Sequence, residues 1–504
     1  MEIKRKQLLI FSSVLVGLFL LASAYLGFSL ELTLLGLAGM AVVPYLVVRF
    51  PEWFLVGALF VPQWKTILGS GSASGSGDPT VIMLMCLAVG LLWRTLMWFG
   101  RIGYSELRGL FSRQLFQISA FVFFAAVLSV SYTYTNAPDY GGTKLSRFLL
   151  IGGLLFISPF FVLLTESDFL TFSRLFVGAG TITAVTLVAS LGMRNRESEG
   201  DITRIGAGWL VGMAMLLLIF YPLSHNPRRQ RALLICLLPV LVGGSMAAAA
   251  RGPILCLVLC VLLGMAILTR VGKLRSSVAL SIVLFLIVGA GAAYFVLKQF
   301  DAEKFNAKAT ELEEMASGGS SSGSAAKRLD FYRVTLAAIP NQPIFGTGIG
   351  SWGVFYFGSD ARGYPHNVLL EITYEEGIVG LAAFLILLFA MGVALVRMIK
   401  ASHSHFLVVG LLVLYCVLVS LFSGDLDDDR VMWLWMGVGL SVCRMVQTRI
   451  STYCQIQWEM RQQQAAMPSR SFPGPAYSRQ LATRAPDRYP VQKKDRAWRE
   501  KFVS

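Results

Sequence analysis

The chain has 504 residues, of which 55% are hydrophobic and only 14% are charged. About a quarter of the residues of a soluble domain are charged, so this composition excludes an ordinary soluble protein. The formal net charge is +15 at pH 7. The basic residues lie in short clusters between apolar runs and in the C-terminal tail, which is typical of membrane-facing loops and argues against a nucleic-acid partner.

The apolar residues form runs of about 17–22 residues, the length of a helix that crosses a bilayer. Because a spanning backbone must satisfy its own hydrogen bonds, each run is predicted to be helical. The fold class is therefore an all-α polytopic membrane protein with about fourteen transmembrane helices. In chain order the predicted spans are 8–28, 31–49, 52–68, 80–98, 115–132, 147–165, 169–191, 207–224, 232–249, 252–268, 277–297, 367–396, 406–422 and 431–446.

The distribution of lysine and arginine predicts the orientation. Lys4, Arg5 and Lys6 precede the first apolar run, which is longer than the core of a typical signal peptide and is followed by further spans, so we interpret it as an uncleaved helix. Basic residues also concentrate in alternate loops and in the tail. The positive-inside rule then places both termini in the cytoplasm.

This orientation divides the chain into four parts. Residues 1–297 form N-terminal transmembrane helices, 298–366 an external, periplasmic loop, 367–446 the C-terminal transmembrane helices and 447–504 a basic cytoplasmic tail. Within the loop, residues from about Ala325 to Ile339 read as a helix that Pro340 ends. The polar, proline-containing tail is predicted to be disordered and drawn to anionic membrane lipids.

The densest polar pattern lies in the external loop and the start of the following span. An arginine is followed four residues later by an aromatic residue, then by a Pro-x-x-Gly-x-Gly turn, and then by His-Asn with Gly-x-x-Gly ten residues beyond the asparagine. The residues are Arg328, Tyr332, Pro343, Gly346, Gly348, His366, Asn367, Gly377 and Gly380.

This order and spacing resemble the O-antigen ligase and polymerase superfamily of bacterial inner-membrane proteins. The chain departs from the family pattern at Tyr332, where tryptophan is usual, and at Ala250-Arg251-Gly252, where Ser-Arg-Gly often opens a span. The resemblance implies transfer of a glycan from a polyprenyl-diphosphate carrier to an acceptor hydroxyl, of lipid A–core or another sugar, in the periplasm and without metal or cofactor. It leaves ligase and repeat-unit polymerase both open.

The arginines have a physical reason to bind the donor. The leaving group is a diphosphate whose negative charge grows as the glycosidic bond breaks, and guanidinium groups bind phosphate bidentately and stay charged at any working pH. Arg328, Arg333 and Arg251 are therefore candidate diphosphate-binding residues. Arg251 opens a predicted helix, whose N-terminus also favours anions. An arginine at such a position can alternatively snorkel to lipid headgroups.

His366 is the candidate catalytic base. The acceptor hydroxyl requires a base that titrates near neutral pH, and His366 is the only histidine in the predicted outer segments. Asn367, Tyr332, Gly346 and Gly348 are supporting residues of the site. A capping or solvated loop role is the plain alternative for His366, and a packing role for Tyr332.

Two other groups of charges are interpreted as structural. Glu371, Glu375 and Glu376 begin a predicted helix, where the dipole favours acids. The acidic turn from Asp425 to Asp429 is predicted to be a solvated loop rather than a cation site. The competing function of another class is a transporter or flippase without covalent chemistry, which would carry paired charges in mid-span; the predicted spans are nearly free of charge.

Overall fold

The computed structural model describes residues 50–67, 87–88, 90–91, 114–190, 200–248, 251–272, 324–402, 404–426 and 429–466. These residues form helices and connecting turns, with no strand among them. The described chain divides at Gln447 into two units, and everything below concerns the first unit unless the tail is named. The all-α expectation is confirmed for the described residues.

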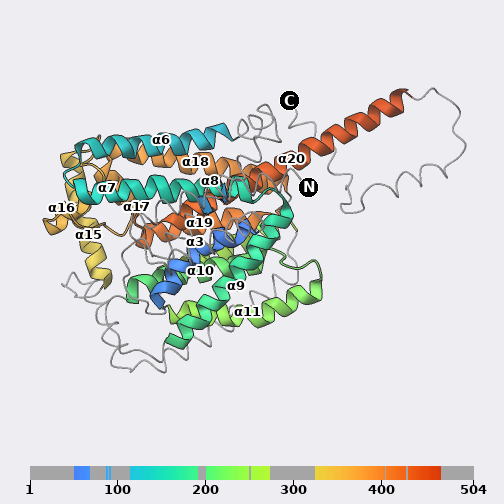
Figure 1. Ribbon diagram of the computed structural model, residues 1–504, viewed down its shortest axis with the longest axis horizontal. Coiled ribbons are helices and arrows are strands. Elements are labelled where there is room, and N and C mark those ends of the chain that lie inside the picture. The colour runs from blue at the N-terminus through green and yellow to red at the C-terminus, as the bar shows by residue number, and fades with distance from the viewer. Residues whose placement is uncertain are drawn as a thin grey trace, which may run out of the picture. The chain divides into compact units, whose positions relative to one another are not determined.

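Most of the helices follow the apolar runs of the sequence, whereas Pro138–Arg147 and Ser324–Ala338 are polar. Their bounds are α3 Pro51–Ile67, α6 Leu115–Ser131, α7 Pro138–Arg147, α8 Gly153–Val162, α9 Glu166–Ser190, α10 Gly200–Phe220, α11 Pro227–Ala247, α12 Arg251–Arg270, α15 Ser324–Ala338, α16 Trp352–Phe357, α17 Val368–Glu375, α18 Gly377–Ala401, α19 Leu407–Ser423 and α20 Arg430–Ala466 (Figure 1). A π-helical turn, Phe148–Gly152, joins α7 to α8 without a break.

Six of the described helical segments are long and apolar enough to cross a membrane, judged by length and composition. They are Leu115–Tyr134, Pro138–Val162, Glu166–Ala189, Pro227–Ala247, Gly252–Arg270 and Gly377–Ala401, and α10 and α19 contain shorter apolar helices. The expected spans 8–28, 31–49 and 277–297, and nearly all of 80–98, lie outside the described residues. The total of about fourteen therefore stays a prediction.

Packing places α10 at the centre of one group of helices. It contacts α3, α9, α11, α12 and α19, and its residues from Ala207 to Ile219 are almost all buried around the whole helix. A helix that is apolar on every side belongs in an interior. A second contact joins α6 to α18, which lie side by side in Figure 1. Stacked aromatic rings fill the space beside that pair, with the Phe121 and Phe156 centroids 4.0 Å apart.

Several expected boundaries are wrong. The span predicted as 207–224 is Gly200–Phe220, and three other differences change the interpretation. The span predicted to begin at 147 begins at Pro138, so Lys144 lies inside a helix and not in a loop. The span predicted as 367–396 is two helices, α17 and α18, because the chain turns at Gly377, whose φ is +66°. The tail predicted to be disordered from 447 remains helical to Ala466; residues 467–504 lie outside the described residues.

Candidate functional site

The helix expected in the external loop is confirmed as α15, and it presents Arg328 and Tyr332 one turn apart. The Arg328 guanidinium donates to the backbone oxygen of Phe422 at 3.0 Å and to Ser423 Oγ at 3.4 Å. The Tyr332 hydroxyl donates to the backbone oxygen of His366 at 3.3 Å. These two side chains therefore tie α15 both to the C-terminal end of α19 and to the candidate base.

The glycine-rich turn before the histidine is confirmed, and its backbone packs closely against two other parts of the chain. Gly346 and Gly348 have φ values of +69° and +93°, a region that residues with a Cβ rarely adopt. A Cβ at Gly346 would lie 2.4 Å from the oxygen of Glu375, and one at Gly348 would lie 2.4 Å from Thr135 Cα. Only glycine lets this turn reach both the end of α17 and the corner between α6 and α7.

Hydrogen bonds hold the turn in that position. The Gly348 N–H donates to the oxygen of Glu375 at 2.7 Å. From the other side, the hydroxyls of Tyr134 and Thr135 donate to the oxygens of Phe345 and Ile349, at 2.7 and 2.8 Å. The segment that leads to the histidine is therefore fastened to two separate helical elements.

His366 lies two residues before the start of α17, in a strained backbone conformation. Its φ is +59°, which is uncommon for a residue other than glycine and is often found at functional sites. Its ring lies 4.4 Å from that of Tyr364, centroid to centroid, and is half-buried. Asn367 then caps α17, because its side-chain oxygen accepts from the N–H groups of Leu369 and Leu370 at 3.0 and 3.1 Å.

The surroundings of the imidazole favour its neutral form. Burial, followed by the positive charges of Arg328 and Arg362, lowers the pKa of His366 to about 4. Among the described residues, its Nδ1 atom is buried without a hydrogen-bond partner. An unsatisfied buried polar atom costs free energy, and a functional role is one of the reasons for which a folded protein retains one.

Arg362 belongs to this site although the sequence reading did not single it out. Its Nε and Nη2 atoms donate to one oxygen of Asp425, at 3.3 and 3.1 Å. Its guanidinium also lies over the ring of Tyr364, 5.4 Å from the centroid. The prediction that the acidic turn is solvated is therefore wrong for Asp425 and Asp429, both of which are buried. Asp427 and Asp428 lie outside the described residues.

The other two candidate arginines are Arg333 on α15 and Arg251 at the start of α12. Arg333 is exposed, and its place five residues after Arg328 turns it about 140° around α15 from that side chain. Arg251 begins α12 as expected, but its side chain lies outside the described residues. The start of α12 is nevertheless close to the Arg328 anchor, since a Cβ on Gly252 would lie 3.3 Å from Phe422 Cβ.

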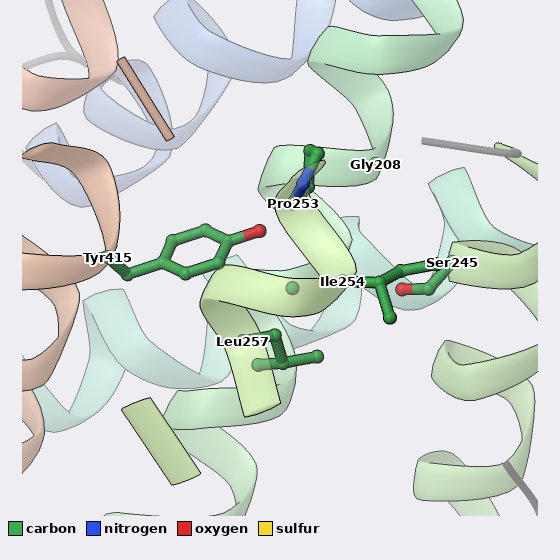
Figure 2. A pocket seen from close by; sticks show the side chains of 7 residues that line it. Gly208, Ser245, Pro253, Ile254, Leu257 and Tyr415 are labelled. Carbon is green, nitrogen blue, oxygen red and sulfur yellow. The ribbon is translucent and has the colours of Figure 1, made fainter. Parts of the chain in front are cut away.

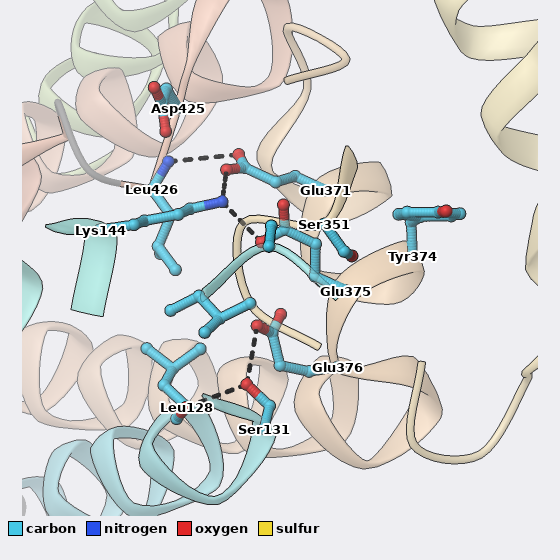
Figure 3. A network of polar contacts seen from close by, with 12 residues as sticks. Leu128, Ser131, Lys144, Ser351, Glu371, Tyr374, Glu375, Glu376, Asp425 and Leu426 are labelled. Atoms are coloured by element: carbon cyan, nitrogen blue, oxygen red, sulfur yellow. Dashed lines mark hydrogen bonds and ion pairs between the residues drawn. The ribbon is translucent and has the colours of Figure 1, made fainter. Parts of the chain in front are cut away.

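A buried charge cluster next to the site was missed by the sequence interpretation (Figure 3). Lys144 Nζ donates to Glu371 and, at 2.6 Å, to Glu375, and all three side chains are fully buried. The equally buried Glu376 accepts from Ser131 Oγ at 3.4 Å. The four-residue spacing of Glu371 and Glu375 places them on one helix face, and that face points inward. This four-residue spacing was the feature of the sequence from which the buried cluster could have been predicted.

A small pocket elsewhere in the bundle is unsuited to a phosphate. It lies between α10, α11, α12 and α19, and its seven lining residues are all uncharged (Figure 2). Its polar atoms include the hydroxyls of Ser245 and Tyr415, which have no hydrogen-bond partner within the described part of the chain. No cluster of three or more residues able to hold a metal ion occurs among the residues that the structure describes.

These features define a multi-pass helical membrane protein with a polar site at one end of its helices. Residues 232–385 match the family described as O-antigen ligase, and this segment contains every site residue predicted from the sequence. The match covers less than a third of the chain and supports membership of the O-antigen ligase superfamily, whose members are glycan ligases and polymerases of the bacterial inner membrane. Comparison with curated proteins finds no match. Lys144, Asp425 and the α6–α7 corner lie outside the matched segment.

Proposed function

We propose that the protein transfers a glycan from a polyprenyl-diphosphate carrier to an acceptor hydroxyl at the periplasmic face of the membrane. The observation that carries the proposal is that α15 presents Arg328 and Tyr332 one turn apart. Tyr332 donates to the backbone oxygen of His366 at 3.3 Å, and the charge of Arg328 helps to lower the pKa of that imidazole. A cation for the leaving group beside a neutral base is the arrangement that this reaction requires.

The reaction breaks the bond between the anomeric carbon and the diphosphate oxygen. The acceptor oxygen forms the new bond to that carbon, its proton passes to His366, and polyprenyl diphosphate leaves as an anion. Arg328 meets the charge that develops on the leaving oxygen, and Arg251 is proposed to join it from the start of α12. Backbone N–H groups at a helix N-terminus favour the same anion.

Donor binding is proposed to strengthen the base. In the free protein burial, and after it the nearby guanidinium groups, keep His366 neutral by lowering its pKa to about 4, but a base with so low a pKa accepts a proton weakly. A bound diphosphate offsets that positive charge and raises the pKa toward neutrality. His366 therefore becomes an effective proton acceptor only when the donor is in place.

Transport without covalent chemistry is the competing function, and it would place paired charges within the spans. The spans are not free of charge, because Lys144 lies inside the helical segment Pro138–Val162. It lies about 9 Å from the start of that segment, however, and it is paired with carboxylates beside the proposed site. The cluster thus stabilises the helices beside the proposed site. It is not placed to line a transport path through the centre of the bundle.

The decisive experiment supplies the purified full-length protein with a polyprenyl-diphosphate-linked glycan and two acceptors, lipid A–core and a second carrier-linked repeat unit. We expect a glycan attached to one of them, and the product separates ligase from polymerase. Release of no polyprenyl diphosphate with either acceptor, while the labelled carrier crosses the bilayer, would establish transport instead.

The proposed orientation has its own test. A single cysteine at the exposed Ala361, in a variant that lacks the native cysteines, is expected to react with an impermeant thiol reagent from the periplasmic side of intact cells. Reaction only after the inner membrane is opened would place His366 in the cytoplasm and remove the proposed mechanism.

A further inference from the structure

Arg362 combines an accessible guanidinium with a buried anchor. Its side chain is 38% exposed, whereas that of its partner Asp425 is 1% exposed. An ion pair with an exposed partner contributes little to stability. The buried carboxylate of Asp425 therefore serves mainly to orient the accessible guanidinium of Arg362. Tyr364 supports the same placement, since the guanidinium lies over its ring and that ring makes a T-shaped contact with the ring of His366.

The position of Arg362 works against the base in the absence of an anionic ligand. Two guanidinium groups near one imidazole make it harder to protonate, so a site that had to bind only an uncharged sugar would gain nothing from the second. With a diphosphate present, the second guanidinium matches a second unit of negative charge. The arrangement is therefore complementary to a dianionic group.

Arg362 is linked to the buried charge cluster through Asp425 and the next residue, Leu426. The N–H of Leu426 donates to Glu371 Oε2 at 3.2 Å (Figure 3). The other oxygen of Glu371 accepts from Lys144. Glu371 also lies one helical turn after Asn367 on α17, so it fixes the Asp425 turn relative to the helix that follows His366.

We propose that Arg362 binds the diphosphate of the lipid-linked donor beside His366, and that Glu371, held by Lys144, positions Arg362 through the Asp425 turn. The inference rests on the proposed glycan transfer and extends it to residues outside the pattern that suggested that function. Arg362 acts on the ligand directly, whereas Glu371 acts through Asp425.

The test of Arg362 measures binding to the full-length protein in nanodiscs. The probes are undecaprenyl diphosphate and, as a ligand without phosphate, undecaprenol. We expect Arg362→Gln to weaken diphosphate binding about tenfold or more, the usual effect of losing a hydrogen bond to a charged group, and to leave undecaprenol binding unchanged. The matched control is Lys327→Gln, which removes an exposed positive charge next to Arg328 and is expected to bind both probes like the wild type.

The outcomes separate the inference from the function beneath it. If Arg362→Gln binds the diphosphate like the wild type while Arg328→Gln is impaired, Arg362 is not part of the site. If the wild type binds both probes equally well, the donor itself is wrong and the proposed function fails. Should Arg362→Gln not be recovered folded, Arg362→Lys takes its place, and wild-type diphosphate affinity in that variant would also overturn the assignment.

The positioning role of Glu371 is tested against its neighbour Glu376. Both carboxyls are buried, but the side-chain hydrogen bond of Glu376 within the described part of the chain is with Ser131 on α6, whereas Glu371 bonds the Asp425 turn. We expect Glu371→Gln to raise the KM for the donor several-fold with little change in kcat, and Glu376→Gln to leave the KM unchanged. An equal rise in both variants, or none in either, would show that the cluster supports the fold without positioning Arg362.

Discussion

Two polar regions meet at α17 and differ in almost every property. The site around His366 is partly exposed and positive, with Arg328 and Arg362 near an imidazole that stays neutral. The cluster around Lys144 is closed, and it pairs one buried ammonium group with the carboxyls of Glu371 and Glu375. The first region is arranged to receive an anion from outside. In the second region, Lys144 pairs with Glu371 and Glu375 within the protein. We therefore expect substitutions in the first region to change activity, and loss of the buried cation from the second to change stability.

The largest expected effect on activity comes from His366→Ala. Removal of a general base lowers rates by about 10²- to 10⁴-fold, while the half-buried position should leave the protein folded. The measurement is the rate of glycan transfer by purified protein. His405→Ala is the matched control, since His405 pairs with Glu166 at 2.8 Å outside the site and should keep transfer intact. Wild-type rates in His366→Ala would leave the site without its base.

The largest expected effect on stability comes from Lys144→Met. It leaves buried carboxyls without their cation, and breaking a buried ion pair in this way costs about 3–5 kcal/mol. We expect a lower melting temperature in detergent, or loss of the protein from membranes. Lys327→Met, which changes an exposed lysine on α15, should melt like the wild type. A normal melting temperature for Lys144→Met would remove the distinction between the two regions.

A smaller effect is expected where the glycine turn joins the two regions. Gly348→Ala combines a φ of +93° with a Cβ only 2.4 Å from Thr135 Cα, so steric overlap adds about 1–3 kcal/mol to the backbone strain. Gly358→Ala is the matched control, because its φ is +71° but no atom lies within 4 Å of the new Cβ. It should cost only about 1–2 kcal/mol. Equal melting temperatures for the two variants would contradict the packing of the turn.

The finest test concerns the pH dependence of transfer. A general base works when unprotonated, so kcat/KM should fall as the pH drops through the pKa of His366, which burial and the two arginines lower to about 4. Arg328→Gln removes a positive charge and should raise that pKa, which moves the acid-side loss of kcat/KM to higher pH. Lys327→Gln should leave the profile unchanged. If the pH dependence of kcat/KM is the same in Arg328→Gln as in the wild type, the charge of Arg328 has no effect on the pKa of His366.

The sequence by itself determined the parts that depend on local pattern. Long apolar runs predicted α6, α9, α11, α12 and α19 to within a few residues because a helix in a bilayer must be apolar along its length. Pro340 correctly ended α15, and glycines at fixed spacing correctly predicted the turn that carries Gly346 and Gly348. The family pattern also brought Arg328 and His366 into one hypothesis before any contact was known.

Only the tertiary structure decided how charges distant in sequence are paired. Lys144 and Glu371 are 227 residues apart, and Arg362 and Asp425 are 63 apart. A hydropathy analysis predicts that such residues lie outside the interior, because it considers the free energy of burying each charge by itself. Folding offsets that cost by bringing opposite charges together, and no local pattern in the sequence records which partner will arrive.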